Sequence, residues 1–310
     1  MGHDYVVITG IAGNLGRLLA KRLHKEARII GIDRRPFDDR PKDVIHHQID
    51  IRRKKAEEIF RSRQIGAVFH MGTMHNPRQP AAERYSWNIL GTTKILEFCR
   101  RYRIPKFVFL SSADVYGPNP ANPNFLTEDA PLQGWRDSGG GLRDLVEADM
   151  LVQSFFWKDP DTDIIILRPV HIVGPNVRNA PTRYFNLGRA PVLAGFNPMV
   201  QLIHEDDLTE ALALCLRRKV RGIFNIEGAG AVPVSEVLSQ LAVPTFSVPH
   251  PLLHAGLRLM WKWHLTSFPA GEMDFLRYIC MVDGTRAREE LGFVAKKSMH
   301  ETIKSIRQRG

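Results

Sequence analysis

The chain has 310 residues, of which 44% are hydrophobic and 25% are charged, proportions that are typical of globular proteins rather than of disordered or fibrous ones. Lys and Arg outnumber Asp and Glu by 43 to 33, and the net charge of +10 favours anionic partners. The basic residues are scattered and are not interleaved with aromatic residues, so we do not expect the protein to bind nucleic acid.

Three features favour a soluble, cytoplasmic protein. No apolar run reaches the roughly 18 residues that a membrane-spanning helix needs. The first expected strand begins within a few residues of Met1, which leaves no room for a signal peptide. The three cysteines, Cys99, Cys215 and Cys280, are far apart and form no CxxC pair, which is typical of free thiols in a reducing compartment.

The N-terminal stretch predicts a strand, a glycine-rich turn and a helix in direct succession. Residues 5–8 are apolar or aromatic and predict a buried strand, and residues 17–24 have helical spacing. Between them stand Gly10, Gly13 and Gly16. In a dinucleotide fold such glycines permit a tight turn, close approach of the pyrophosphate and close packing of helix on strand. The helix N-terminus offers N–H groups and a positive dipole end to the phosphates.

The second expected strand, 27–33, ends in an acid. Asp33 follows the glycine turn at about the distance where a dinucleotide fold places the carboxylate that binds the adenosine ribose. That carboxylate would repel a 2′-phosphate, so it favours NAD as the cofactor. Arg34 and Arg35 follow at once and could offset the repulsion, which leaves NADP possible.

Strands and helices continue to alternate along the chain. We expect strands at 44–49, 67–72, 105–110, 164–168, 200–203 and 222–226, and helices at 81–102, 142–157 and 206–216. This alternation predicts an α/β fold with a Rossmann-like, doubly wound parallel sheet. The segment 118–141 is rich in Pro, Asn, Gly and Asp and predicts a long loop, which in a compact domain is usually functional.

The regular alternation ends in two segments, 171–199 and 228–310. We expect them to form a smaller C-terminal substrate-binding domain or lid over the sheet. The dinucleotide-binding domain would then comprise 1–170, with 200–227 returning to the sheet.

One helix of the smaller part is amphipathic. Residues 252–265 carry His254, Arg258 and Lys262 at four-residue spacing, with apolar residues around the rest of the helix. A lid or docking helix is the favoured interpretation. A membrane-surface helix, and with it peripheral membrane contact, is possible but not favoured.

A series of short motifs runs through the whole chain in order. They are Thr9-Gly-Ile-Ala-Gly-Asn-Leu-Gly16, Asp33, Asp50-Ile51, Val68-Phe-His-Met-Gly72, Asn88-Ile-Leu-Gly-Thr92, Leu110-Ser-Ser-Ala-Asp-Val-Tyr-Gly117, Leu167-Arg-Pro169 with Gly174-Pro175, Ile203-His-Glu-Asp-Asp207, and the stretch 283–292. Together they resemble the extended short-chain dehydrogenase/reductase family, the NAD-dependent sugar epimerases and dehydratases.

The resemblance implies a set of cofactor contacts. By analogy the glycine loop holds the pyrophosphate, Asp33 the ribose, the pair after the third strand the adenine edge, and the fourth strand end the nicotinamide ribose. The residues implied are Gly10, Ala12, Gly13, Asn14, Leu15, Gly16, Asp33, Arg34, Asp50, Ile51, His70, Met71, Gly72, Asn88, Ser111, Arg143 and Pro169.

The resemblance also implies catalytic positions, and at one of them this chain departs from the family. Ser112 falls on the catalytic Ser/Thr, and Asn88 on the residue that organises the active site. Family members carry YxxxK on the helix after the long loop, where the Tyr moves the substrate proton and the Lys lowers the Tyr pKa. The corresponding stretch here, 138–149, contains neither tyrosine nor lysine.

Two alignments of that helix are open. Aligning it by Glu147 puts Gly139 and Arg143 at the Tyr and Lys positions, whereas a shift of two residues puts Gly141 and Leu145 there. Arg143 could bind ribose hydroxyls, but its very high pKa makes it a poor proton relay.

Three other residues are weighed as substitute acid/base groups. Asp114 falls where dehydratase members carry an acid, although a capping carboxylate would look the same. His171 follows Arg168-Pro169 at the mouth of the sheet and has the right side chain for proton transfer near neutral pH, but a lone histidine is more often merely hydrogen-bonded. Tyr116 belongs to a motif that is usually structural.

The substrate signals differ from those of the sugar-nucleotide enzymes. The stretch 198–204 lacks the arginine that clamps a diphosphate in those relatives. A buried diphosphate needs cationic partners, and Arg178, Arg183 and Arg189 are the candidates for that role. A smaller or more apolar substrate is at least as compatible.

We therefore expect an NAD(P)-binding oxidoreductase, epimerase or dehydratase that acts on a sugar-derived or other small hydroxylated substrate with a non-standard acid/base group. The alternative is a non-catalytic dinucleotide-binding sensor or scaffold. No metal site is expected. The helices near 81–103 and 142–157 resemble those by which family members dimerise, so a homodimer is expected as well.

Overall fold

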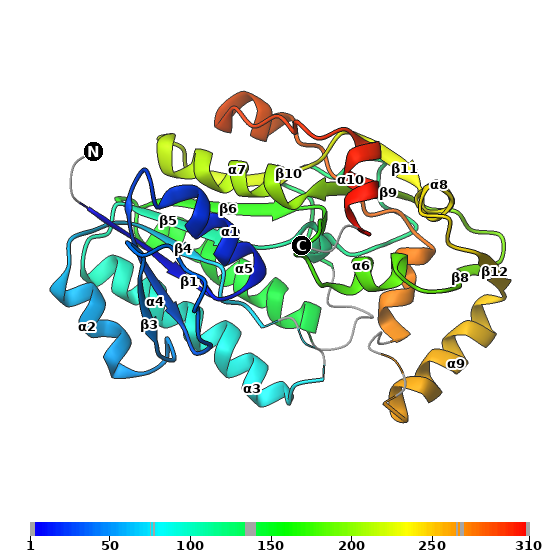
Figure 1. Ribbon diagram of the computed structural model, residues 1–310, viewed down its shortest axis with the longest axis horizontal. Coiled ribbons are helices and arrows are strands. Elements are labelled where there is room, and N and C mark those ends of the chain that lie inside the picture. Colours follow the sequence, from blue (N-terminus) through cyan, green and yellow to red (C-terminus); the bar gives the residue numbers. More distant parts are fainter. Residues whose placement is uncertain are drawn as a thin grey trace.

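Seven parallel strands form the main sheet of the computed structural model, which describes residues 4–74, 76, 78–133, 141–264, 266 and 270–307 (Figure 1). Their spatial order is β10-β6-β5-β4-β1-β2-β3. Their bounds are β1 Tyr5–Thr9, β2 Arg28–Asp33, β3 Ile45–Gln48, β4 Ile65–His70, β5 Lys106–Leu110, β6 Asp163–Pro169 and β10 Gly222–Ile226. The order reverses between β1 and β4, so the sheet is doubly wound, as the sequence pattern predicts.

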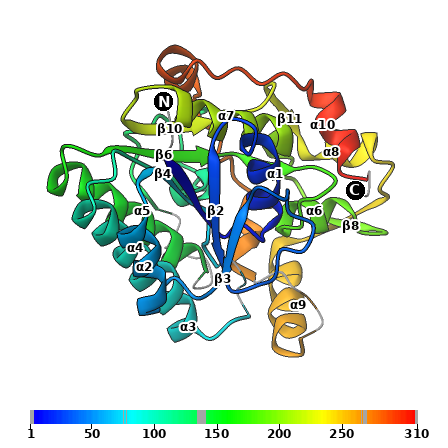
Figure 2. The ribbon, with the colours of Figure 1, turned by 60° about the vertical axis from the view of Figure 1, so that its left-hand side comes forward.

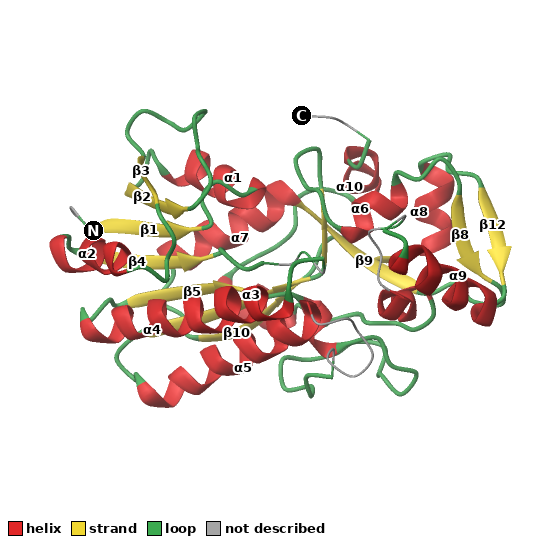
Figure 3. Cartoon of the chain, turned by 90° about the horizontal axis from the view of Figure 1, so that it is seen from below, coloured by secondary structure: helices red, strands yellow, loops and turns green. Residues whose placement is uncertain are grey.

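Helices cover both faces of this sheet. One face carries α1 (Asn14–Leu23) and α7 (Glu205–Arg217), and the other carries α2 (Lys54–Ser62), α4 (Gly91–Arg101) and α5 (Gly141–Lys158) (Figures 2 and 3). Because both faces are covered, the inner strands β5 and β6 are mostly apolar and are buried along nearly their full length, whereas the edge strand β3 is largely polar and only partly buried.

The single helix expected over 81–102 is a continuous run of three pieces. It consists of α3 (Ala81–Tyr85), a π-helical turn η1 (Ser86–Leu90) and α4. A π turn accommodates one residue more than an α turn and commonly occurs at functional sites. Trp87 and Asn88 lie in this turn and are buried.

Two smaller sheets form at the C-terminal edge of the large one. A three-stranded sheet has the order β11-β9-β7, and β12 pairs with β8. The bounds are β7 His171–Val173, β8 Ala190–Leu193, β9 Met199–His204, β11 Ala231–Pro233 and β12 Thr245–Val248. The expectation that 200–203 would join the main sheet is wrong, because β9 pairs with β7 and β11 instead.

The remaining helical elements surround these small sheets. They are α6 Ala180–Phe185, α8 Val234–Gln240, α9 His250–Lys262 and α10 Met299–Ser305, with 3₁₀ turns η2 Ala113–Tyr116 and η3 Ala270–Leu276 and a π turn η4 Ala287–Leu291. Side chains from α6, β8, β9, α8 and α10 form a second apolar core, separate from that of the main sheet. None of the described helices is both long enough and apolar enough to cross a membrane.

A buried histidine joins three elements of the main core. The imidazole of His70, at the end of β4, is 1% exposed. Its Nδ1 lies 2.6 Å from Oγ1 of Thr9 on β1, and its Nε2 lies 2.9 Å from Oγ1 of Thr92 on α4. Burial lowers the pKa of His70 to about 4, so the ring is neutral at physiological pH.

We predict that His70 makes the protein less stable in mild acid. Between the ordinary pKa of 6.5 and about 4, the unfolded chain binds a proton that the folded chain does not. The contribution of His70 to the free energy of unfolding is therefore fully present above pH 6.5 and is lost as the pH falls toward 4. From pH 7 to pH 5 the loss is about 2 kcal/mol. Urea unfolding at these pH values should show a flatter pH dependence for His70→Gln, whereas His300→Gln, which changes an exposed histidine, should behave as wild type. Equal slopes in all three proteins would refute the prediction.

Candidate functional site

The glycine turn brings backbone against backbone at the C-terminal edge of the sheet. Gly10 has φ +74, and a side chain there would place its Cβ 2.7 Å from Cα of Gly72, which follows β4. A Cβ at Gly16 would overlap the backbone of the same turn, so α1 packs on β1 only because this residue is glycine. Helix α1 begins at Asn14, with Gly13 as its N-cap and no acid in its first turn. Its amide end is thus open to a phosphate.

Asp33 is buried at the end of β2 and is engaged on both oxygens. Oδ2 accepts a hydrogen bond from the amide of Ala12, which couples the acid to the glycine turn. Arg35 donates two hydrogen bonds to the same carboxylate, from Nε to Oδ1 at 3.1 Å and from Nη2 to Oδ2 at 2.9 Å. The side chain of Arg35 is 58% exposed, so the guanidinium closes the solvent side of the acid. Asp33 ends β2, as the sequence predicted, but the ion pair with Arg35 was not foreseen.

Trp87 lies beyond the acid, between two arginines. The guanidinium of Arg34 lies 4.9 Å from the centre of the indole ring and that of Arg52 lies 5.1 Å from it. The indole N–H donates to the carbonyl of Gly72. Arg52 also binds both oxygens of Asp50, and these hydrogen bonds lower the pKa of Asp50 although partial burial acts against them. The Asp50 carboxylate is therefore occupied within the chain.

The remaining residues expected around the cofactor lie on the same edge. Asn88 is buried and exchanges two hydrogen bonds with the backbone of Met74, at 2.7 and 3.0 Å. Ile51 is buried against Gly91 at the start of α4. Met71 and Leu15 are half-buried, and Pro169 ends β6. The ring of His70 faces inward as described above, so only its backbone is at the edge.

An ion pair lies under the ends of β5 and β6. Arg168 on β6 is 1% exposed and binds Asp149 on α5 through two hydrogen bonds, 3.0 Å from Nε and 2.7 Å from Nη2. Ser111 donates to the same carboxylate at 2.6 Å. Its hydroxyl is therefore directed into the core.

Tyr116 belongs to this buried cluster. Its hydroxyl accepts from Arg168 and donates to Oδ1 of Asn225, each at 2.8 Å. Burial raises the pKa of Tyr116 to about 12, in spite of the neighbouring cation. The geometry fits the structural role that the sequence favoured for this residue.

Three candidate catalytic residues lie above this cluster. The hydroxyl of Ser112 accepts from the amide of Asp114 at 3.1 Å and caps the 3₁₀ turn η2. The carboxylate of Asp114 lies 3.5 Å, Oδ1 to Nδ1, from the imidazole of His171 at the start of β7. Both side chains are partly exposed, and Phe275 contacts the imidazole edge-on at 5.8 Å between ring centres. The sequence analysis considered Asp114 and His171 as separate candidates, whereas in the structure the two side chains form a pair.

The helix that carries YxxxK in family members is described only in part. Gly139 lies outside the described residues. Arg143 is exposed on the first turn of α5, where its neighbour Asp144 pairs with Arg84 at 3.0 Å. Sequence reasoning missed the Arg84–Asp144 ion pair, which joins α3 to α5.

A second connection that the sequence did not reveal joins the glycine turn to the small sheets. The side chain of Asn14 donates to the carbonyl of Asn176, whose own amide donates to Glu205 at 2.6 Å. Glu205, the first residue of α7, is 1% exposed, and burial raises its pKa. A side chain at Gly174, where φ is +156, would overlap this glutamate. Asn14, Gly174 and Glu205 each belong to one of the sequence motifs, but the motifs themselves do not indicate that these three residues meet.

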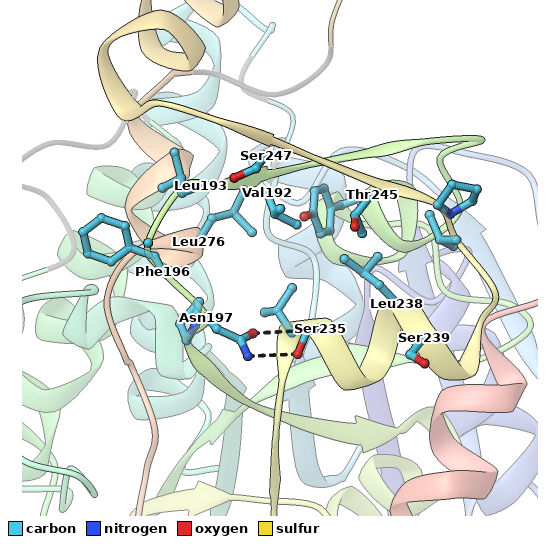
Figure 4. Close-up of a pocket in the computed structure, with 16 residues that line it drawn as sticks. Val192, Leu193, Phe196, Asn197, Ser235, Leu238, Ser239, Thr245, Ser247 and Leu276 are labelled. Atoms are coloured by element: carbon cyan, nitrogen blue, oxygen red, sulfur yellow. Dashed lines mark hydrogen bonds between the residues drawn. The ribbon is translucent and has the colours of Figure 1, made fainter.

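A cavity of about 660 Å³ lies between β8, β12 and α8 (Figure 4). Its described lining is apolar with several hydroxyl groups and one amide, from Asn197, which exchanges two hydrogen bonds with Ser235. None of the candidate cofactor or catalytic residues lines it. Arg277, beside it, lies over Phe196 at 5.2 Å, and its buried Nε has no hydrogen-bond partner among the described residues. Sequence reasoning did not identify Arg277.

The arginines weighed as diphosphate partners lie elsewhere around the small sheets. Arg189 packs over the ring of Phe246 at 5.1 Å, Arg178 is exposed just before α6, and Arg183 is exposed on α6 itself. Within the described ranges no group of three or more His, Cys, Asp or Glu residues is arranged to hold a metal ion.

Comparison with known proteins identifies relatives along the whole chain. Residues 6–226 match the NAD dependent epimerase/dehydratase family. An uncharacterized protein of Mycobacterium tuberculosis is 26% identical over 301 residues, which cover 94% of this chain and 80% of the relative. A UDP-glucose 4-epimerase of Dictyostelium discoideum is 28% identical over 173 residues, covering 50% of this chain and 49% of its own.

Solved structures share the fold at low identity. The UDP-glucose 4-epimerase of Thermotoga maritima, solved with UDP-glucose, superposes with a TM-score of 0.76 at 19% identity, covering 98% of both chains. The dTDP-glucose 4,6-dehydratase of Bacillus anthracis, solved with NAD, has a TM-score of 0.74 at 17% identity, covering 98% of this chain and 96% of that one.

We predict that Asp149 is essential for stability. Asp149→Ala leaves the guanidinium of Arg168 buried without its anion, which should lower the free energy of unfolding by about 3–5 kcal/mol. The double change Asp149→Ala with Arg168→Met removes both charges and should cost clearly less than the sum of the single changes. Urea unfolding followed by circular dichroism measures each value.

The control is Asp39→Ala, which removes the exposed partner of Arg17. That loss should be about 1 kcal/mol or less. If Asp149→Ala cost no more than this control, the ion pair would not have the importance assigned to it.

Proposed function

We infer that this chain, which belongs to the NAD dependent epimerase/dehydratase family, is an enzyme that binds NAD and carries out its proton transfers with the Asp114–His171 pair. The single observation that supports this most is the 3.5 Å approach of the two side chains beside Ser112. All three lie after β5 and β6, neighbouring strands whose carboxyl ends meet at the edge where the glycine turn also lies. Ligands of doubly wound sheets bind at this edge.

The residues of the glycine turn fit a dinucleotide. The backbone of Gly10, Gly13 and the first turn of α1 would hold the pyrophosphate, because the two glycines carry no side chain and the helix dipole favours an anion. Asp33 would accept the ribose hydroxyls. When bound, the dinucleotide supplies a hydride acceptor for a substrate carbon that bears a hydroxyl.

Side chains of the protein would then bind that hydroxyl and remove its proton. Ser112 would hold the substrate oxygen by a hydrogen bond. The imidazole of His171 would take the proton, and the carboxylate of Asp114, on its Nδ1 side, would orient the ring and stabilise the charge that forms. Tyr116 is buried on Arg168 and would take no part.

The sequence supports a substitution of this kind. No tyrosine occurs between Tyr116 and Tyr184, and no lysine between Lys106 and Lys158. The family's usual proton relay is therefore absent from the stretch in which it would stand, and the Asp114–His171 pair is the titratable pair that we propose in its place.

We propose that the substrate is a sugar-derived or other small hydroxylated compound held between the main sheet and segments 171–199 and 228–310. The cavity between β8 and α8 has no charged side chain in its described lining, which suits a neutral group. Arg277 beside it has an unpaired donor that suits a phosphate oxygen. A nucleotide-sugar would need this arginine, whereas a smaller substrate would not.

A homodimer through the outer face of α3, η1 and α5 is consistent with this function. Tyr85, Leu90, Met150 and Trp157 are exposed there by 43%, 49%, 58% and 90%. This assembly stays a prediction.

The test of the acid/base pair compares two Asp–His pairs in the same protein. A spectrophotometric scan of alcohols and nucleotide-sugars with NAD(H) and NADP(H) would first identify a substrate. Asp114→Asn and His171→Gln should then each lower kcat by about 10²–10⁴-fold without changing the cofactor Kd. The matched controls are Asp43→Asn and His24→Gln, a partly exposed pair 3.2 Å apart at the C-terminal end of α1, which should have no effect. Full activity in both site variants would exclude the proposed relay.

The alternative is a dinucleotide-binding sensor or scaffold without catalysis, which the missing Tyr and Lys favour. It predicts tight cofactor binding and no turnover in the scan, together with a biological role that survives Ser112→Ala. Loss of the biological role in Ser112→Ala would contradict the alternative.

We predict that Arg35 controls the choice between NAD and NADP. Its guanidinium sits on Asp33, where a 2′-phosphate would otherwise meet a carboxylate. Arg35→Ala should weaken NADPH binding by about tenfold, as the loss of one charge-assisted contact implies, and should leave NADH binding unchanged or tighter. Fluorescence titration with both cofactors measures the two affinities. Arg53→Ala, at an arginine on the N-cap of α2, serves as the control. An equal change for both cofactors would contradict the assignment.

A further inference from the structure

Helix α9 presents an apolar stripe to solvent. Leu252, Leu259 and Trp263, at its C-cap, are exposed by 66%, 59% and 68%, and their spacing of seven and four residues places them on one face of the helix. Met260, 41% exposed, borders them. None of the thirteen residues of α9 is buried. A lid helix closed on the chain's own core would bury such a face.

The opposite face of α9 is the one that contacts the protein. Arg78, in the loop after β4, stacks on Trp261 with its guanidinium 3.5 Å from the ring centre. It donates to the carbonyl of Trp261 at 3.1 Å and to that of Thr266 at 2.6 Å. Trp261 lies about half a turn from Leu259 and Trp263 around the helix. The apolar stripe therefore faces away from the body of the protein, at whose edge α9 lies (Figures 1 and 2).

The charge around the stripe has one sign. No Asp or Glu occurs from residue 237 to residue 271, although the chain has 33 of them. Arg258 and Lys262 are exposed along one flank of the stripe. A helix with Leu, Met and Trp on one side and Lys and Arg beside them has the composition of interfacial membrane helices. Trp is enriched at the depth of the lipid headgroups.

We propose that α9 docks the protein on an anionic lipid bilayer, with Leu252, Leu259 and Trp263 inserted among the headgroups and Arg258 and Lys262 on the lipid phosphates. This proposal does not depend on the catalytic assignment. The contact of Arg78 with α9 places the loop after β4 next to the docked helix, so the C-terminal edge of the sheet would lie near the membrane surface. We favour a lipid surface over a groove on another protein as the binding partner of α9, because the cationic flank of the stripe is complementary to anionic lipid.

Vesicle co-sedimentation of the full chain tests the proposal. The protein should sediment with vesicles of phosphatidylcholine mixed with phosphatidylglycerol and should stay in the supernatant with phosphatidylcholine alone. Leu259→Ser with Trp263→Ser should lower the partition coefficient at least tenfold. Arg258→Gln with Lys262→Gln should lower it by roughly fivefold for each cation removed. Brominated acyl chains should quench wild-type tryptophan fluorescence more than that of Trp263→Phe.

The control variant is Phe125→Ser with Val294→Ser, which removes two exposed apolar side chains, 51% and 65% exposed, elsewhere on the surface. It should bind vesicles as wild type does. Thermal unfolding should show that every variant folds, because all the changed side chains face solvent. The proposal is overturned if the wild type does not sediment with anionic vesicles, or if the stripe variant binds as well as wild type. It is equally overturned if the stripe instead mediates self-association, seen as a dimer by light scattering that Leu259→Ser with Trp263→Ser abolishes.

Discussion

The buried ion pair between Arg168 and Asp149 is the interaction on which the candidate site depends. It joins β6 to α5. The hydroxyl of Ser111 donates to Asp149, and the hydroxyl of Tyr116 accepts from Arg168. Removing two charges from water is costly, and only this dense set of hydrogen bonds offsets the cost. The ends of β5 and β6 are thereby held in one arrangement, so two residues that follow them, Asp114 and His171, lie beside each other at fixed positions.

A second set of contacts prepares the cofactor side in the same way. Asp33 is tied to the glycine turn through Ala12 and is closed from solvent by Arg35. On the inner side the neutral ring of His70 connects β1, β4 and α4. The carboxylate of Asp33 is thus already paired within the chain, and a ligand would exchange contacts with Arg35 there, whereas the amide end of α1 is open to it. An arrangement of this kind is preorganised, which limits the entropic cost of binding.

The sequence predicted the main sheet well because the signals for it are local. Buried parallel strands appear as continuous apolar runs, and a glycine-rich turn between a strand and a helix is characteristic of dinucleotide folds. The strand at 199–204 was assigned to the wrong sheet because its apolar run looks the same in either, and only pairing with β7 and β11 decides. The contact between Asp114 and His171 joins residues far apart in sequence, and the pattern around 252–265 does not say which face of the helix meets the protein. These outcomes are set by packing, not by local pattern.

The π turn at Ser86–Leu90 determines what a deletion in this helix would do. It holds one residue more than a regular α turn, just before Gly91 and Thr92. Deleting a single residue here would restore a regular α turn and would keep α3 and α4 in register, because five residues of a π turn cover nearly the same rotation as four residues of an α turn. The change would be confined to the turn itself, in which Asn88 binds the backbone of Met74. A deletion in this turn would therefore alter the edge of the candidate site without turning the helix on either side of it.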